Sequence, residues 1–373
     1  MKEPRSGTVG LADELARERQ LLVNGPGRSP PYARALELLP SVLAGPAGRL
    51  VEAAWRQRRF FAWYERPLLL LAALRNDALA EGEAHPLWAA FASPDPSADA
   101  VTADALRAAL DGSRERVLDA LAHRAVQTNE TSRAVAWLWP AALAGASGGA
   151  RPVALADVGA SAGLNLVADG LPPIWTDEDG APLDVAQRVQ AWSRLGLDES
   201  PLDVGRAEDA RWLRACVWPG EREREERLLL AIEAFRAARI RPDAPVLVPI
   251  GATNVPARLG LLSAADAGAL VIAYQTVLRD YLAPEEHAEY AHGMRAWLAT
   301  RPPGQALWIE MEFLERGDLP AVILAHVRAP GGALRSLALG RCGSHPRSVQ
   351  RSRDAEAELR ELLAASSHAA AGA

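Results

Sequence analysis

The fold is decided by residues 153–166, which read Val153-Ala-Leu-Ala-Asp157-Val-Gly159-Ala-Ser161-Ala-Gly163-Leu-Asn165-Leu166. The apolar run predicts a buried strand, and the two glycines predict a sharp turn before a helix begins. Open α/β sheets use this arrangement to bring backbone close to a nucleotide. The letters from Gly159 to Gly163 also fit the G-x-S-x-G turn that carries the nucleophile of serine hydrolases. The function therefore depends first on which kind of turn this is.

Seven apolar runs after residue 150 predict the strands of one sheet. They fall at 153–158, 189–197, 246–250, 269–274, 306–311, 321–327 and 333–339. Most are separated by stretches with helical spacing, at 206–216, 221–239, 256–262 and 284–299. This alternation predicts a parallel sheet with helices on both faces. Only Pro330-Gly331-Gly332 joins the last two runs, so these two strands should form an antiparallel hairpin.

The first 145 residues have helical spacing and no convincing strand. We therefore expect a helical N-terminal or lid domain at 1–145, an α/β domain at 146–350, and a C-terminal helix with a frayed tail at 351–373. Five parallel strands followed by a hairpin resemble the Rossmann-like sheet of class I S-adenosylmethionine-dependent methyltransferases. The expected fold class is thus α/β, with a mostly parallel sheet behind an all-helical N-terminal domain.

Composition excludes several classes of function. An apolar share of 49% and a charged share of 24% are ordinary for a globular protein. The net charge of −6 argues against bulk binding of nucleic acid. The two cysteines, Cys216 and Cys342, form no C-x-x-C pair, and no metal site is expected. The sequence has neither a signal-like apolar segment at its start nor a run of about 18–20 apolar residues, so we expect a cytoplasmic protein without a membrane partner.

The glycine motif fits a nucleotide-binding turn better than a nucleophile turn. Gly159 and Gly163 stand where backbone meets ligand and where helix meets strand. Asp157 matches the acid that opens the methyltransferase pattern acid-x-Gly-x-Gly-x-Gly, although Ser161 replaces the middle glycine. A hydrolase needs several strands and an oxyanion loop before the nucleophile, and here mostly helical residues precede it.

A serine hydrolase also needs an acid and a histidine after Ser161. Asp266 or Asp318, with His326 or His345, formally completes such a set. His326, however, lies inside an apolar run, which is typical of a core histidine.

A second acid is expected at the end of the second large strand, where it accepts hydrogen bonds from ribose hydroxyls. Asp198 is the best match, although an insertion at about 170–188 delays it. The alternative is that Asp198 and Asp203 cap the next helix. After the third strand many methyltransferases carry an Asp for adenine. Here Thr253 or Asn254 stands in its place, as an adenine ligand or as part of a plain turn.

Polar residues also interrupt the apolar runs of the fourth and fifth strands. Tyr274 and Gln275 lie where the fourth strand should end, at the edge of the sheet where ligands bind. Glu310 and Glu312 should share one face of the fifth strand, because alternate residues point the same way. Buried carboxylates are costly unless they are paired or belong to a site. The alternative is that one or both follow the strand end into water.

Upstream, hydrogen-bonding side chains crowd the segment before an apolar helix. Gln127, Asn129, Glu130 and Arg133 belong to it. They form either a loop that faces the cofactor, or a helix start with Thr128 as its cap.

These segments, in this order, resemble a bacterial family classed as domain of unknown function 2332. The matching segments are Gln127-Thr-Asn129-Glu130 with Arg133, Val158-Gly-Ala-Ser-Ala-Gly-Leu-Asn165-Leu166, Gly196-Leu-Asp198 with Pro201-Leu-Asp203, Glu208-Asp-Ala-Arg211-Trp212-Leu with Val217-Trp218-Pro219, and Tyr274-Gln-Thr-Val-Leu with Tyr281-Leu282. The resemblance implies a methyltransferase-type Rossmann fold with a helical N-terminal part, and it names no substrate. The chain departs from the family pattern Gly-Asp-Ala at Gly251-Ala252-Thr253.

We therefore expect S-adenosylmethionine to bind at the carboxyl edge of the sheet and a small molecule to accept the methyl group. The expected cofactor residues are Asp157, Gly159, Ala160, Ser161, Gly163, Asn165, Asp198, Thr253, Asn254 and Tyr274. The expected acceptor-side residues are Gln127, Asn129, Arg133 and Gln275, with Glu130 or Glu312 as the base if the acceptor must lose a proton. The alternatives are a non-catalytic nucleotide- or metabolite-binding protein of the same fold and, third, a serine hydrolase that uses Ser161.

Overall fold

The computed structural model describes residues 7–24, 29–127, 129–261, 269–314 and 317–370. Contacts divide the chain into two units. We call Met1–Thr128 with Gly205–Arg227 the helical unit, and Asn129–Val204 with Leu228–Ala373 the sheet unit. This grouping differs from the division expected at residue 145, because residues 129–145 group with the sheet and residues 205–227 with the N-terminal helices.

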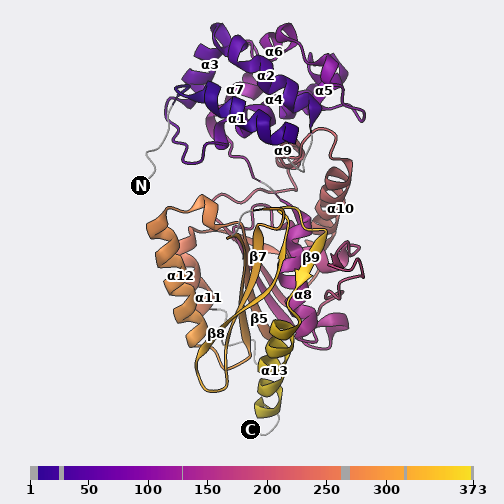
Figure 1. Cartoon of the computed structure of the whole chain (residues 1–373), viewed down its shortest axis with the longest axis vertical. Helices are drawn as coiled ribbons and strands as arrows, with labels where there is room; N and C mark the ends of the chain where they lie inside the picture. Colours follow the sequence, from indigo (N-terminus) through magenta and orange to yellow (C-terminus); the bar gives the residue numbers. More distant parts are fainter. Residues whose placement is uncertain (1–6, 25–28, 128, 262–268, 315–316, 371–373) are drawn as a thin grey trace. The chain divides into compact units, whose positions relative to one another are not determined.

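The helical unit contains helices where the sequence spacing predicts them (Figure 1). They are α1 (Leu11–Asn24), α2 (Pro30–Leu43), α3 (Pro46–Trp55), α4 (Glu65–Glu81), α5 (Trp88–Phe91), α6 (Ala103–Ala109), α7 (Glu115–His123) and α9 (Ala207–Cys216), with the 3-10 helices η1 (Gly82–Ala84) and η2 (Ala98–Ala100). Pro30 suits the first turn of α2, where its missing N–H costs no hydrogen bond. Whether these helices form a domain of their own stays a prediction.

One buried arginine of α4 explains why residues 205–227 join the helical unit. Arg75 donates hydrogen bonds to the carbonyl of Phe91 at 2.8 Å and to the carbonyl of Arg214 at 2.7 Å. It also donates to the carbonyl of Val217 and, at 2.7 Å, to the carboxylate of Glu225. A buried guanidinium needs several acceptors at once, and three of these four come from the later segment.

The sheet unit is built on a nine-stranded, mostly parallel sheet in the order β2-β9-β8-β7-β6-β5-β1-β3-β4. The strands are β1 (Val153–Val158), β2 (Thr176–Asp177), β3 (Ala191–Asp198), β4 (Val246–Pro249), β5 (Leu270–Thr276), β6 (Ala306–Phe313), β7 (Ala321–Arg328), β8 (Leu334–Cys342) and β9 (Ser348–Arg351). The seven runs predicted as strands are confirmed, and β7 and β8 form the predicted antiparallel hairpin. Mixed α/β architecture is therefore established.

Two short strands were not predicted. β2 lies inside the stretch expected to be a loop at about 170–188, and it pairs in parallel with β9 at the far end of the sheet. A strand of two residues is shorter than any periodic pattern can reveal. Its existence depends on β9, which is about 170 residues away in the sequence.

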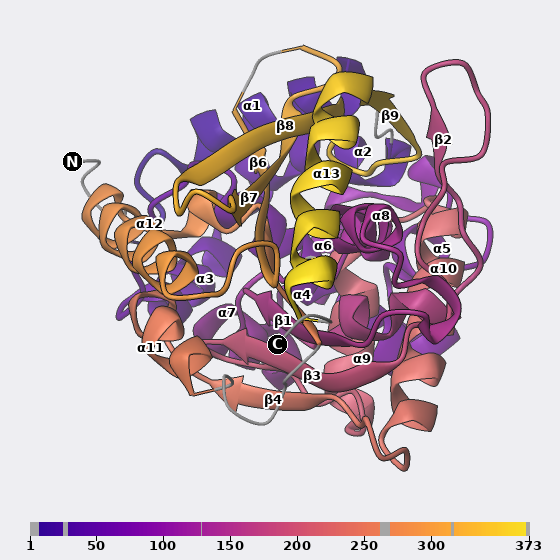
Figure 2. The same cartoon turned by 90° about the horizontal axis from the view of Figure 1, so that it is seen from below.

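Helices cover both faces of the sheet, as the alternation predicts (Figures 1 and 2). The helices of this unit are α8 (Val135–Leu143), most of α10 (Arg222–Ala238), α11 (Val255–Gly260), α12 (Pro284–Ala299) and α13 (Arg353–Ala370), with the 3-10 helices η3 (Thr131–Ala134), η4 (Ser147–Gly149), η5 (Leu164–Gly170), η6 (Ala252–Asn254) and η7 (Arg279–Tyr281). α11 and α12 pack on one face, in a core that includes Val158, Met294 and Trp308. α8 packs on β5 and β6 from the other face. No described helix is long and apolar enough to cross a membrane.

The chain reverses its direction of travel across the sheet at β1. β1 pairs in parallel with β3 on one side and with β5 on the other. β4 extends the sheet beyond β3, and β6 extends it beyond β5. In open α/β sheets, ligands bind at such a reversal, outside the carboxyl ends of the strands. The turn after β1 lies at this position.

Candidate functional site

The turn after β1, Gly159–Gly163, is the centre of the candidate site, and we call it the glycine turn. Gly159 and Gly163 both have positive φ, 76° and 70°. A Cβ atom on Gly163 would lie 2.7 Å from Leu247 Cδ2, and one on Gly159 would lie 3.1 Å from Leu278 Cδ1. Both positions therefore need glycine for conformation and for space. Gly159 is exposed, although the residues on either side of it are buried.

Ser161, at the middle of the glycine turn, also has a positive φ, of 50°. This conformation is uncommon for a residue with a side chain and persists only where its surroundings hold it. Asp198 stabilises this conformation of Ser161, because its Oδ2 accepts a hydrogen bond from the Ser161 backbone N–H at 2.8 Å. The other oxygen, Oδ1, accepts from the Ser200 N–H at 2.8 Å. Asp198 thus joins the end of β3 to the glycine turn.

The sequence left two interpretations of Asp198 open, a ribose ligand and a cap of the next helix. Helix α9 begins after Arg206, so neither Asp198 nor Asp203 is its cap, and that alternative is wrong. Asp203 instead accepts a hydrogen bond from Arg239 at 2.9 Å. Contact between Asp198 and a ribose stays a prediction.

The helix after the glycine turn is a 3-10 helix, η5, and not the α-helix that usually follows such a turn. Side chains occupy its carbonyls. The Asn165 carbonyl accepts from the Trp137 indole at 2.9 Å, and Arg194 donates to the Leu166 carbonyl and, at 2.7 Å, to the Asp169 carboxylate. Pairing of this kind competes with the i→i+4 bonds of an α-helix.

Asp157 and Tyr274 are register partners on β1 and β5 and point to the face that α8 covers. Burial raises the pKa of Asp157 to about 7, although the Tyr274 hydroxyl opposes the shift. The two groups influence each other, but their geometry falls short of a hydrogen bond. Tyr274 is fully buried and stacks on Trp137, with 6.2 Å between ring centroids.

Gln275 points to the opposite face from Tyr274, because neighbouring residues of a strand alternate. Its Nε2 donates to Glu312 at 2.7 Å. Its Oε1 accepts from the Tyr290 hydroxyl at 2.6 Å and from the Trp308 indole at 3.2 Å. We call Gln275, Tyr290, Trp308, Glu310 and Glu312 the Gln275 network. The two expected site residues Tyr274 and Gln275 are therefore separated by the sheet itself.

Glu312 fixes the backbone that follows β5. It is 2% exposed and accepts from the backbone N–H groups of Leu278 at 3.1 Å and Arg279 at 3.3 Å. The Val277 between β5 and these N–H groups has a φ of 58°. Burial raises the pKa of Glu312 to about 7, while the Gln275 amide opposes the shift. The carboxylate is thus already engaged by the protein.

The prediction that Glu310 and Glu312 share a face is confirmed, since both belong to the Gln275 network. Glu310 accepts from His326 Nε2 at 2.8 Å, and His326 Nδ1 lies 2.7 Å from the Ser336 hydroxyl. His326 also stacks on Trp308, with 4.4 Å between centroids. It is a core histidine with both ring nitrogens bonded, as the apolar run around it indicates.

Thr253 and Asn254 lie in η6, just after the carboxyl end of β4. Thr253 is half-buried and Asn254 is exposed. They stand at the same edge of the sheet as the glycine turn, and adenine recognition by either stays a prediction.

The segment expected to face the cofactor is divided between the two units. Gln127 belongs to the helical unit, whereas Asn129, Glu130 and Arg133 belong to the sheet unit. The expected cap, Thr128, lies outside the described residues. Glu130 takes the capping role at η3, because its Oε1 accepts from the Ser132 N–H at 3.1 Å. A helix therefore does start in this segment, with Glu130 as its cap, and whether the segment also faces a cofactor stays a prediction.

Glu130 is 5% exposed and has a partner that the sequence did not indicate. Its Oε2 lies 3.2 Å from His345 Nδ1. Arg133 donates to the carbonyl of Ser344, the residue before His345, at 3.1 Å. His345 follows the end of β8, which runs in the same direction as β6 because both are antiparallel to β7. The topology therefore places His345 at the carboxyl edge, whereas the sequence pattern indicated it only as a possible histidine of a serine hydrolase.

Among the described residues, one group has metal-ligand spacing, and it lies in the helical unit: Asp77, Glu81 and His85. Arg114 and Arg116 pair with its carboxylates. The Leu87 N–H donates to His85 Nδ1 at 3.1 Å, so in the neutral ring the proton lies on Nε2, which is 3.2 Å from Asp77. A protonated Nε2 has no lone pair for a metal, and this group is an ion-pair cluster.

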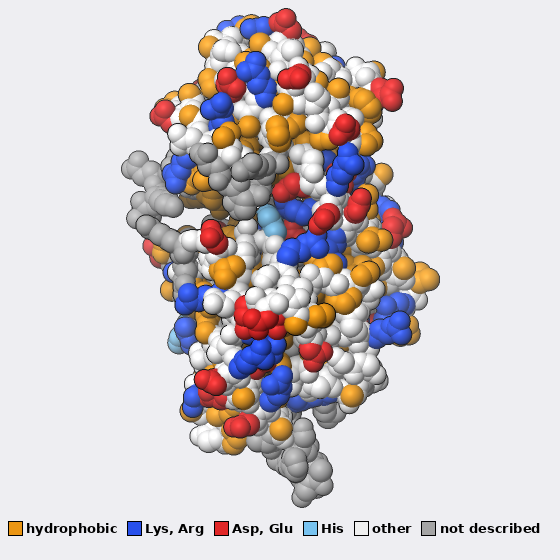
Figure 3. Space-filling view, turned by 45° about the vertical axis from the view of Figure 1, so that its right-hand side comes forward, with side chains coloured by type: hydrophobic (Ala, Val, Ile, Leu, Met, Phe, Trp, Pro, Cys, Tyr) orange, Lys and Arg blue, Asp and Glu red, His pale blue; other side chains and the backbone are white. Residues whose placement is uncertain are grey.

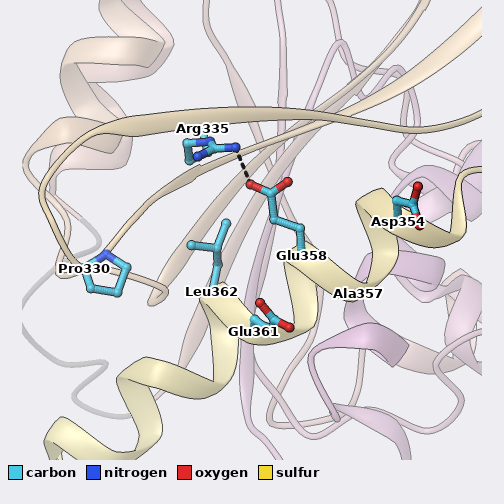
Figure 4. Close-up of a pocket in the computed structure, with 7 residues that line it drawn as sticks. All are labelled: Pro330, Arg335, Asp354, Ala357, Glu358, Glu361 and Leu362. Carbon is cyan, nitrogen blue, oxygen red and sulfur yellow. Dashed lines mark ion pairs between the residues drawn. The ribbon is translucent and has the colours of Figure 1, made fainter.

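An open pocket lies away from the glycine turn, between α13 and the β7–β8 hairpin (Figure 4). Its lining is mostly exposed and acidic: Pro330, Arg335, Asp354, Ala357, Glu358, Glu361 and Leu362. Arg335 pairs with Glu358 across it at 2.5 Å. None of the expected site residues lines it. Chemistry and position therefore favour the carboxyl edge as the functional site.

The surface in Figure 3 has basic and acidic side chains interspersed, with no large area of one sign on the described part of the face in view. Comparison with known proteins supplies one match. The family model described as "Uncharacterized protein conserved in bacteria (DUF2332)" matches residues 23–351. Neither a curated protein nor a solved structure matches the chain.

Proposed function

We propose that this chain, which belongs to the DUF2332 family of uncharacterized bacterial proteins, is an S-adenosylmethionine-dependent methyltransferase. Its sheet unit would be a variant of the class I methyltransferase fold, and its acceptor a small molecule. The observation that carries the proposal is the position of the glycine turn. It follows an acid-ended strand at the reversal point of a parallel sheet, where nucleotide-type ligands bind in this architecture.

Two buried polar atoms near the glycine turn support a ligand there. Asn165 Oδ1 is buried without a hydrogen-bond partner in the described structure, and the buried Tyr274 hydroxyl interacts with Asp157 but makes no well-formed hydrogen bond. Buried polar groups normally find partners, so such atoms need an explanation. A bound amino group would satisfy Asn165 Oδ1, which accepts hydrogen bonds and lies directly after the turn. The residues present therefore suit the amino-acid end of the cofactor.

Each expected contact follows from position. The exposed backbone of Gly159 and the glycine turn would line the methionine part, and Asp198, at the end of β3, the ribose. Thr253 or Asn254, after β4, would reach the adenine. The cofactor supplies an electrophilic methyl group when it is bound. The protein then needs to align the acceptor and exclude water, because methyl transfer depends mainly on positioning.

A non-catalytic metabolite-binding protein of the same fold is the second candidate. It is favoured by the state of the expected acceptor-side groups. Gln275 is fully buried with its amide bonded on both sides, and Glu312 is engaged by backbone. Such a protein would bind the cofactor without turning it over.

The serine hydrolase has one supporting observation, the positive φ of Ser161, since nucleophile turns are strained. Of its histidine candidates, His326 has both ring nitrogens bonded, and His345 lies against Glu130, which is not an acid candidate of the hydrolase. Asp266, one of its acid candidates, lies outside the described residues. Labelling by a fluorophosphonate that disappears in Ser161→Ala would favour this alternative.

The proposal is tested by isothermal titration calorimetry of the full chain with S-adenosylmethionine and with S-adenosylhomocysteine. We expect both to bind with micromolar dissociation constants, and ATP at the same concentration not to bind. A chain that binds neither methyl donor nor product at millimolar concentration would sink the proposal. Binding without any methyl transfer to a broad panel of small hydroxyl and amino compounds would favour the second candidate.

A further inference from the structure

We propose that His345, oriented by Glu130, is the base that takes a proton from the acceptor. This inference rests on the proposed methyltransferase function and deepens it, because it names the chemistry of the acceptor. The acceptor would be an O–H or N–H compound that must lose its proton as the methyl group arrives. Glu130, a candidate base from the sequence, becomes a positioning residue in this arrangement.

The contacts of Glu130 determine how His345 is held. Its Oε1 is fixed by the backbone N–H of Ser132 at 3.1 Å and by the Ser132 hydroxyl at 2.6 Å. Its Oε2 lies 3.2 Å from His345 Nδ1. A carboxylate accepts hydrogen bonds but donates none, so it selects the ring form that carries its proton on Nδ1. The lone pair of the neutral ring is then on Nε2.

The two ends of the imidazole lie in different surroundings. Nδ1 is buried and lies 3.2 Å from the Glu130 carboxylate, a charge contact that lacks the geometry of a hydrogen bond in this structure. The side chain as a whole is 35% exposed, whereas that of Glu130 is 6% exposed. A buried carboxylate beside one nitrogen of a partly exposed ring is the arrangement of a histidine base and its orienting acid. Arg133 adds a fixed positive charge on η3 and anchors the loop through the Ser344 carbonyl at 3.1 Å.

The pair lies at the same edge of the sheet as the glycine turn, and the segment that carries Glu130 packs near the residues that follow the turn. Phe313 at the end of β6 and Cys342 at the end of β8 are both paired with Ala321, so His345 follows the same edge of the sheet. Cα atoms of η3, which begins directly after Glu130, come within 8 Å of those of η5, which follows the glycine turn. Two indoles join the segments: Trp175 donates to the Ser132 carbonyl at 2.8 Å, and Trp137 to the Asn165 carbonyl at 2.9 Å.

The chemistry balances without a further reactant. The acceptor heteroatom forms a bond to the methyl carbon as the carbon–sulfur bond breaks, and that electron pair stays on sulfur, which becomes a neutral thioether. The proton of the acceptor passes to His345 Nε2, and Glu130 stabilises the resulting imidazolium. Two charged groups lie near the ring among the described residues: Glu130, 3.2 Å from Nδ1, and Arg133 of η3, which donates to the carbonyl of the preceding Ser344. The Cys342 thiol at the end of β8 is neutral, because burial raises its pKa to about 12.

The test uses the full chain and needs no acceptor. Nitrogen-15 NMR at pH 8 reads the ring form of His345, whose signal is assigned by its loss in His345→Gln. We expect the Nδ1–H form in the wild type and a shift toward Nε2–H in Glu130→Gln. Carbethoxylation of Nε2 by diethyl pyrocarbonate, mapped by mass spectrometry, should slow about tenfold in Glu130→Gln, the factor that a charge-assisted hydrogen bond contributes.

Asp119→Asn is the matched control. His123 lies 2.9 Å from Asp119, but both side chains are exposed, at 74% and 68%. Removing the Asp119 charge should change the carbethoxylation rate of His123 by less than about twofold, because exposed ion pairs hold their geometry weakly. The Nε2–H form at His345 in the wild type would overturn the proposal even if Glu130→Gln fails to fold. An unchanged ring form and rate in a folded Glu130→Gln would overturn it as well.

Calorimetry separates this inference from the proposed function. His345→Gln should bind S-adenosylhomocysteine with the wild-type affinity, because the ring lies on the acceptor side. A large loss of that affinity would place His345 on the cofactor and overturn its role as the base. A wild-type chain that binds no S-adenosylhomocysteine would instead sink the methyltransferase, while the NMR result still decides the pairing of Glu130 and His345.

Discussion

Two groups of polar side chains lie on opposite faces of the same strand, and they differ in how fully they are satisfied. The Gln275 network, on the α12 side, uses both ends of the Gln275 amide and both oxygens of Glu312. Around the glycine turn, on the α8 side, Asn165 Oδ1 is buried without a hydrogen-bond partner in the described structure, and the buried Tyr274 hydroxyl makes no well-formed hydrogen bond. A satisfied network stabilises the fold, whereas buried polar atoms without partners need an explanation, and a bound ligand is the one that we propose.

The comparison also separates the two histidine–carboxylate pairs. In the His326–Glu310 pair both ring nitrogens are bonded, and the ring stacks on Trp308. In the His345–Glu130 pair only Nδ1 faces a carboxylate. The same two residue types therefore serve packing in one place and present a base in the other. Substitutions in the Gln275 network should mainly lower stability, whereas substitutions around the glycine turn should mainly weaken ligand binding.

The largest effect should come from the satisfied network. Gln275→Ala removes the partner of the Tyr290 hydroxyl, the Trp308 indole and the Glu312 carboxylate at once, and it leaves a cavity. We expect the free energy of unfolding to fall by about 4 kcal/mol, measured by urea denaturation. Gln187→Ala is the control, because the side-chain amide of the half-buried Gln187 donates to the neighbouring Ala186 carbonyl and joins no such network among the described residues. A loss below about 1 kcal/mol for Gln275→Ala would contradict the closed network.

The pH dependence of stability should sharpen the contrast, through Asp157. Its pKa is about 7 in the folded chain, above the ordinary value of 3.8, because of burial. Between these two values the folded state holds a proton that the unfolded state has released, so stability falls as pH rises from 4 to 7. Asp157→Asn removes this loss, and its advantage over the wild type should grow by about 3 kcal/mol between pH 5 and pH 8.

The control for this titration is Asp111→Asn. The exposed Asp111 has a pKa lowered by the backbone N–H of Ser113. The stability that the Asp111 carboxylate contributes is therefore lost only as pH falls below 4. The difference in unfolding free energy between Asp111→Asn and the wild type should stay constant from pH 5 to pH 8. Glu312→Gln should follow the sign of Asp157→Asn, because burial also raises the pKa of Glu312 to about 7. A flat Asp157→Asn profile would show that its carboxylate is ionised when folded.

A smaller effect on stability, with a large effect on binding, is expected at the glycine turn. Gly163→Ala places a Cβ atom 2.7 Å from Leu247 Cδ2 at a φ of 70°. We expect a loss of about 2 kcal/mol in unfolding free energy and no measurable S-adenosylhomocysteine binding. Gly170→Ala is the matched control, because its Cβ atom would meet nothing within 4 Å. Wild-type binding by a folded Gly163→Ala would place the ligand elsewhere.

The smallest change in stability is expected for Asp198→Asn. The amide keeps an oxygen for one of the two backbone N–H groups of Ser161 and Ser200 but loses the charge. The free energy of unfolding should fall by about 1 kcal/mol. Affinity for S-adenosylhomocysteine should fall about tenfold, since each ribose hydrogen bond to the carboxylate is charge-assisted. Asp203→Asn, whose side chain is exposed and pairs with Arg239, should alter neither.

Much of the fold could be predicted because its signals are local. The apolar runs of β1, β3 and β5–β8 and the helical spacing of α9–α12 depend on residues within one element, and Pro330-Gly331-Gly332 is enough to predict the hairpin. β2 and β9 could not be predicted, since each exists through its pairing with the other. The grouping of residues 205–227 with the N-terminal helices likewise depends on Arg75, more than a hundred residues away.

The sequence by itself determined the strand–turn pattern of residues 153–163, because only glycine tolerates the φ values and close contacts at Gly159 and Gly163. It also determined that Glu310 and Glu312 share a face, since strand periodicity is a property of the backbone. The tertiary structure alone decided that Tyr274 and Gln275 are parted by the sheet, that Asp198 binds the turn, and that Glu130 meets His345. Those pairings join residues far apart in sequence, and burial and hydrogen-bond geometry between packed elements are not encoded in any one segment.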